Sequence, residues 1–135
     1  MSTLQDFLNA NPVDNLTSEV EVSERFKDKA GNVLKFKIKA MDDTTFNDIR
    51  KRCTTTKGRK VEFDVGAFNR AIIIQHTLEP DFKNAESIAK LNCQTPEQYL
   101  QKVMLAGEIV ELAGKIQEIS GFEVEMDALV EEAKN

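Results

Sequence analysis

The segment DVGAFNRAIII, residues 64–74, decides the fold of this chain. Asp64 can cap a helix, and apolar residues would occupy almost every side of the helix that follows. A helix that is apolar all round is a buried one, so we expect this element at the centre of the molecule. Glu79-Pro80 would stop it. The three isoleucines at 72–74 are also compatible with a strand.

Residues 19–39 predict an antiparallel β-hairpin that packs on this central helix. Apolar and polar residues alternate on both sides of a stretch with turn chemistry, residues 27–32, which gives the hairpin one apolar face. Its other face would set Glu19 and Glu21 against three lysines. An isolated hairpin is marginal in water, so the apolar face must lie on helices. That face consists of Val20, Val22, Phe26, Leu34, Phe36 and Ile38.

Further helices are predicted from their start signals. N-cap residues stand at 42–44, a short helix would cover 84–91, and Thr95-Pro96 is a strong start signal for another. The stretch 54–58 would break the first of these helices, and residues 61–63 could form a third, short edge strand.

We therefore expect an α+β fold: a mainly helical single domain over residues 1–135, with a small antiparallel β-hairpin, or such a hairpin with a third short strand, packed on a central helix. Its 135 residues are 41% hydrophobic, which suits one core. Residues 1–15 would form an N-terminal arm and residues 123–135 an acidic C-terminal helix or tail. No apolar run approaches the roughly 18 residues of a membrane span, and the start lacks a signal-peptide pattern, so we expect a cytoplasmic location.

The composition leaves little material for catalysis or metal binding. The chain has one His, one Tyr, no Trp and two Cys without metal-ligand spacing, so we expect no enzyme, no cofactor, no metal site and no disulfide. His76 would be structural, near a helix end where the dipole favours a cation. Glu108 and Glu111 share a helical face but lack a Glu-x-x-His motif, so we expect a charged outer face.

Two apolar patterns are candidates for partner binding. One is a heptad seam, which would pack in the core by default and also offers a surface for self-association or client binding. The other is the amphipathic turn in the arm, which would dock on its own domain or reach a neighbour. The candidate partner-binding residues are Leu105, Ile109, Leu112, Ile116 and Ile119 of the seam and Leu4, Phe7 and Leu8 of the arm.

Charge is unevenly distributed along the chain. Residues 50–60 hold six bases and no acid, whereas the region from Glu108 onward holds eight acids and two bases. We expect a basic loop at 50–60 that complements the acidic C-terminal half, within the domain or between subunits. The alternative is a small nucleic-acid-associated factor that binds through this loop, against which the net charge of −5 argues.

Seven segments spread along the chain carry a resemblance to a known family. They are NPVDNLT (11–17), VSERFKD (22–28), LKFKIKAM (34–41), KVEFD (60–64), EPDF (79–82), CQTPE (93–97) and EISGF (118–122). Together, and in this order, they resemble the XkdN-like phage tail assembly chaperone family.

The resemblance implies a non-enzymatic factor of a bacteriophage or prophage that acts during tail assembly in the bacterial cytoplasm. Such a chaperone would coat the long helical tape measure protein, assist assembly of the tail tube, and be absent from the mature virion. The expected partner is thus the tape measure protein, and the tail tube protein and further copies of the chain are candidate partners. The family has no catalytic motif to transfer. The helical, partly apolar C-terminal half suits contacts with an amphipathic client.

Overall fold

The computed structural model describes residues 2–122, and the centre of the fold is α3 (Val65–His76). Asp64 caps this helix, because its carboxylate accepts the N–H of Ala67 at 3.0 Å. Ile72 and Ile73 have no exposed surface. The three isoleucines are therefore helical, and the prediction of a buried central helix is confirmed.

A three-stranded antiparallel sheet lies beside α3 in the order β1 (Thr17–Val20), β2 (Phe36–Lys39), β5 (Thr77–Glu79). The expected pairing of acids with lysines is present at Glu19, which stands opposite Lys37. The third strand is β5, which follows α3 without a connecting loop and ends at the cis Glu79–Pro80 bond. The short strand predicted at residues 61–63 is also present, but it belongs to a second sheet.

The hairpin over residues 19–39 is present, but its paired strands are shorter than expected. Residues 21–35 leave the sheet as a long loop instead of continuing the first strand. The expected turn lies inside this loop, where the Asp28 carboxylate accepts the N–H groups of Ala30 and Asn32 at 2.9 Å each. These bonds satisfy loop backbone groups that have no partner strand.

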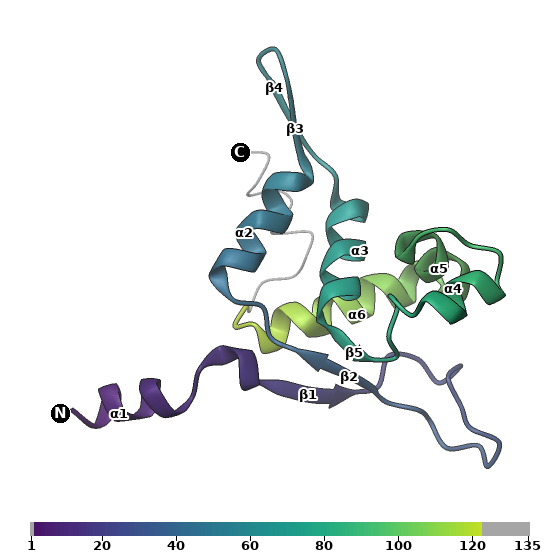
Figure 1. Cartoon of the computed structure of the whole chain (residues 1–135), viewed down its shortest axis with the longest axis horizontal. Helices are drawn as coiled ribbons and strands as arrows, with labels where there is room; N and C mark the ends of the chain where they lie inside the picture. Colours follow the sequence, from purple (N-terminus) through teal and green to yellow (C-terminus); the bar gives the residue numbers. More distant parts are fainter. Residues whose placement is uncertain (1, 123–135) are drawn as a thin grey trace.

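The strand predicted at residues 61–63 is β4 (Lys60–Phe63). It pairs in a second hairpin with β3 (Thr54–Lys57), a strand that was not expected. Gly58 in its turn has a φ of +62°, a conformation that suits glycine. Figure 1 shows this hairpin extending beyond the ends of α2 (Asp43–Arg52) and α3. The region 50–60 is therefore the last turn of a helix followed by a β-ribbon, which corrects the expected basic loop.

Three of the other helices, α2, α4 and α5, begin at the predicted caps. Asp42, Asn84 and Thr95 each accept a backbone N–H at the start of a helix. The remaining helical elements are α1 (Thr3–Ala10), the 3-10 turn η1 (Val13–Asn15), α4 (Ala85–Lys90), α5 (Pro96–Val103) and α6 (Ala106–Ile119). No helix among the described residues is long and apolar enough to cross a membrane.

Side chains from the sheet and the helices share one apolar core. Phe36 and Ile38 of β2 join α3 and α6 in it. The end of α6 is joined to the segment between β2 and α2, because Ser120 Oγ accepts the N–H of Met41 at 2.8 Å. The α+β fold class is thereby confirmed. The expected acidic helix or tail at 123–135 lies outside the described residues.

We predict that Phe36 is among the costliest positions to truncate. The side chain is 5% exposed and its ring packs edge-on against Phe26 at 5.1 Å between centroids. Phe36→Ala should lower the free energy of unfolding by about 3–5 kcal/mol, measured by urea denaturation. Leu34→Ala, two residues earlier and 49% exposed, is the control and should change it by less than about 1 kcal/mol. Equal losses would contradict the prediction.

Candidate docking surfaces

The heptad seam lies on α6 and mostly faces the interior. Leu112 and Ile116 have no exposed surface, and Ile109 and Ile119 are half-buried against the core. Leu105, which precedes the helix, is 60% exposed. Of the five seam residues, Leu105 is thus the one with a largely exposed side chain. Leu105 therefore remains a candidate for partner binding, and partner binding by the seam stays a prediction.

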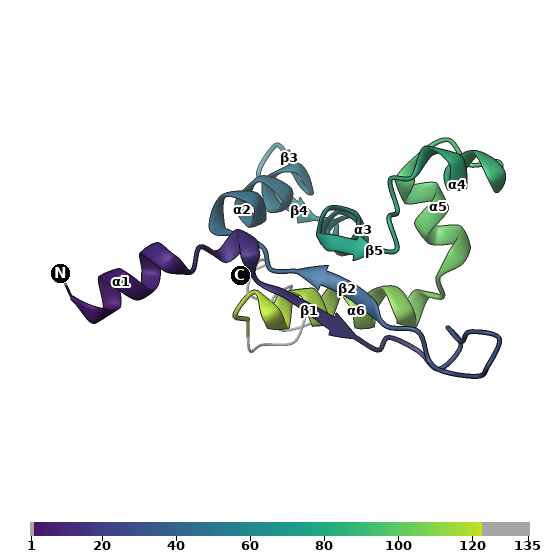
Figure 2. The same ribbon diagram turned by 60° about the horizontal axis from the view of Figure 1, so that its bottom comes forward.

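The arm residues, by contrast, are all on the surface. Leu4, Phe7 and Leu8 of α1 are 68%, 61% and 56% exposed, and no residue of this helix is buried. Figures 1 and 2 show α1 projecting away from the body, joined to it at the start of β1. The structure thus does not dock the arm on its own domain.

A groove that the sequence analysis did not find lies at the opposite end of the sheet. Its volume is about 330 Å³, and one charged residue of each sign, Lys35 and Glu79, also borders it. The apolar lining comes from the loop before β2, the start of β2, the segment just after β5, and α5 with the residue that follows it. These residues are Phe26, Leu34, Phe36, Pro80, Phe82, Tyr99, Val103 and Met104.

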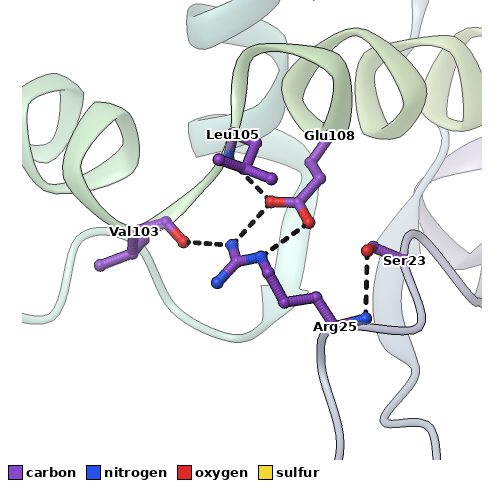
Figure 3. Close-up of polar contacts among 5 residues, drawn as sticks. All are labelled: Ser23, Arg25, Val103, Leu105 and Glu108. Atoms are coloured by element: carbon purple, nitrogen blue, oxygen red, sulfur yellow. Dashed lines mark hydrogen bonds and ion pairs between the residues drawn. The ribbon is translucent and has the colours of Figure 1, made fainter.

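An ion pair anchors one wall of this groove (Figure 3). Arg25 Nη2 and Nε donate to the two carboxylate oxygens of Glu108 at 2.7 and 3.0 Å. Nη2 also donates to the Val103 carbonyl at 3.0 Å, and the guanidinium lies 4.6 Å from the Phe26 ring centroid. The loop that carries Phe26 is thereby held against α5 and α6.

Glu108 is only 7% exposed, which corrects the expectation that it would lie on a charged outer face. Hydrogen bonds from Arg25, and to a lesser extent from the N–H of Leu105, lower the pKa of Glu108 to about 2. Glu111 does lie outside, 3.7 Å from Lys115. The two carboxylates therefore have different roles despite their helical spacing.

The other candidate chemical groups are buried or isolated. His76 is 3% exposed, and its Nδ1 lies 2.9 Å from the Ile72 carbonyl oxygen. Burial lowers the pKa of this imidazole, so the neutral form is favoured in place of the cation suggested by the helix end. Burial also raises the pKa of the Cys53 thiol. Among residues 2–122, no group of three His, Cys, Asp or Glu side chains is placed to hold a metal ion.

We predict that the Arg25–Glu108 pair makes stability depend on acid pH. The pKa of Glu108 is lowered from 4.5 to about 2 on folding, so the unfolded chain binds more protons between these values. The contribution of Glu108 is complete above pH 4.5 and is lost as the pH falls toward 2. Glu108→Gln should lower the free energy of unfolding at pH 7 by about 1–3 kcal/mol. The free energy of unfolding of this variant should also fall less steeply than that of the native chain between pH 4.5 and pH 2.

The control for this change is Glu111→Gln, on the same helix and half-exposed. Its exposed ion pair contributes little, so its denaturation curves should follow those of the native chain from pH 7 to pH 2. Asp28 and Asp42, whose pKa values are also lowered, remain in all three proteins. A Glu108→Gln chain with the native pH dependence would refute the assignment.

Known proteins match this chain along nearly its whole length. The model of a family described as phage XkdN-like tail assembly chaperone matches residues 4–134. The protein XkdN of the phage-like element PBSX of Bacillus subtilis is 31% identical, and the alignment covers 98% of this chain and 93% of XkdN. The B. subtilis protein YqbN is 32% identical over the same shares. The crystal structure of YqbN superposes with a TM-score of 0.72 at 30% identity, covering 91% of this chain and 99% of that one. The chain therefore belongs to the XkdN-like phage tail assembly chaperone family.

Proposed function

We propose that the chain binds the tape measure protein during tail assembly and covers its apolar segments until the tail tube forms around it. The arm is the observation that carries the proposal. A helix with three large apolar side chains and no buried residue gains free energy by covering apolar surface elsewhere. An amphipathic client helix offers such surface at intervals of three and four residues.

The groove supports the same function from the other end of the sheet. Its lining is mainly aromatic and aliphatic, and a volume of about 330 Å³ lies at the lower end of the range for binding pockets. We propose that it takes single large apolar side chains of the client. The Arg25–Glu108 pair would preorganise the wall that carries Phe26, so that binding orders fewer side chains.

The proposal makes the chain an assembly factor rather than an enzyme. Contacts with the tail tube protein and between copies of the chain, action in the bacterial cytoplasm, and absence from the mature virion belong to the same proposal. Family membership supports a role in tail assembly, and the shape and chemistry of the exposed surfaces support apolar client contacts.

We predict that the arm is required for client binding and dispensable for folding. The triple change Leu4→Ser, Phe7→Ser and Leu8→Ser removes the exposed apolar face of α1 and no core contact. Co-purification with the co-expressed tape measure protein should fall at least about tenfold, because exposed side chains of this size supply more than 1.4 kcal/mol together. The far-ultraviolet circular dichroism and thermal midpoint should stay native.

The matched control changes the polar residues of the same helix, as Gln5→Ser, Asp6→Ser and Asn9→Ser. These residues are exposed, and the triple change also shortens three side chains on α1. Co-purification should remain within about twofold of native. If both triple variants lose the client equally, helix formation in the arm, rather than its apolar face, is what matters.

A second prediction concerns the groove. Leu34 borders it and is 49% exposed, so Leu34→Glu should fold and yet place a charge where an apolar side chain would bind. Co-purification should fall by roughly fivefold. The control is Leu78→Glu, 42% exposed on β5 but outside the groove lining, which adds the same charge and should bind the client normally. Equal effects of the two changes would refute a role for the groove.

A further inference from the structure

The strongest charge feature of the described chain is independent of the arm and the groove. Six exposed cationic side chains lie on the last turn of α2 and on the β3–β4 hairpin, and we call them the basic surface. None of them forms an ion pair with an acid among residues 2–122. The basic surface consists of Arg50, Lys51, Arg52, Lys57, Arg59 and Lys60.

The hairpin register concentrates this charge at the tip. Lys57 and Lys60 stand directly opposite each other, so they share one face of the ribbon. Like charges at opposite positions destabilise a strand pair unless an anion lies near them. Glu62 is on the same face, opposite Thr55, and offsets one of the charges. The ribbon as a whole keeps a positive excess that favours an anionic occupant.

The chain itself supplies a matching anion. Residues 123–135, outside the described part, hold five acids and one lysine, a net charge of −4 within a chain of net −5. The acids are Glu123, Glu125, Asp127, Glu131 and Glu132.

The described part of the chain ends beside α2, directly before this segment. After α6 the chain turns at Gly121, with a φ of +93°, and the Phe122 N–H donates to the Gln117 carbonyl at 3.0 Å. The Phe122 ring then packs on Phe46 of α2, with 4.9 Å between ring centroids. Phe122, the last described residue, therefore lies against the helix whose last turn starts the basic surface.

The segment is long enough to reach the hairpin tip. From Phe46 to the end of α2 is about 9 Å at the rise of a helix, and a four-residue strand adds about 13 Å. Thirteen residues span up to about 40 Å when extended. A tether of this length also keeps the acids at an effective concentration of the order of millimolar.

We propose that the acidic segment 123–135 binds the basic surface of α2 and the β3–β4 hairpin. This contact occupies the cations that would otherwise attract nucleic acid or other polyanions in a crowded cell. The segment and the basic surface thus form an electrostatic cover within one chain, and its strength falls as salt rises. The proposal does not depend on the identity of the client.

The test compares full-length chains by amide NMR spectra at low salt. One variant neutralises the segment by Glu123→Gln, Glu125→Gln, Asp127→Asn, Glu131→Gln and Glu132→Gln. The control neutralises five exposed acids of the arm, β1 and the following loop, by Asp6→Asn, Asp14→Asn, Glu19→Gln, Glu21→Gln and Glu24→Gln. Both variants change the net charge by the same amount.

We expect the amide signals of residues 50–60 to shift in the segment variant and to stay in place in the control. Binding of a short single-stranded oligodeoxythymidylate should become at least about fivefold tighter in the segment variant alone. Unchanged signals at 50–60, or equal shifts in both variants, would overturn the proposal. It would also be overturned by a native chain that binds the oligonucleotide as tightly as the segment variant, because the basic surface would then be open to nucleic acid.

Discussion

The burial of α3 against α6 is the contact on which the remaining elements depend. Ile72, Ile73, Leu112 and Ile116 all lose their entire exposed surface in the core that these helices share. Because β5 follows α3 without a loop, the position of the helix also fixes the third strand. The other end of the core is closed by Ser120, which joins α6 to the chain entering α2. One helix pair thus places the sheet and the groove.

Arg25 and Glu108 set the groove within this frame. They are 83 residues apart in sequence, and two charge-assisted hydrogen bonds join a loop without regular structure to the first turn of α6. The same carboxylate accepts the N–H of Leu105, so it also satisfies a backbone donor at the helix start. The tip of this loop is held by its own bridge between Lys27 and Val33, and the Arg25–Glu108 pair adds the contact that fixes the loop, with its aromatic wall of the groove, against α5 and α6.

Local signals explain which elements the sequence could predict. N-caps at Asp42, Asp64, Asn84 and Thr95 act over three residues, and the central helix is visible from an apolar pattern within one segment. The third strand and the groove depend on contacts between distant segments, and no local pattern marks them. Glu108 was misjudged for the same reason: its helical neighbours indicate an outer face, and only the fold brings Arg25 to it. In the β3–β4 hairpin, the alternating Val61 and Phe63 indicate β4, whereas the threonines of β3 have no apolar alternation and β3 was not predicted.

The placement of the surfaces has a consequence for how such a small protein serves a long client. Thr17, where the arm joins, pairs with Lys39, whereas Phe36 at the groove pairs with Val20, so the arm and the groove lie at opposite ends of the same strand pair. In this structure the arm therefore lies away from the groove of its own chain, and no arm residue lines it. In the proposed function, two separate apolar contacts on one molecule would make client binding bivalent, so that each contact could remain weak while the sum is strong. Weak individual contacts are what a chaperone needs if the tail tube is to displace it, since each contact can then be released in turn.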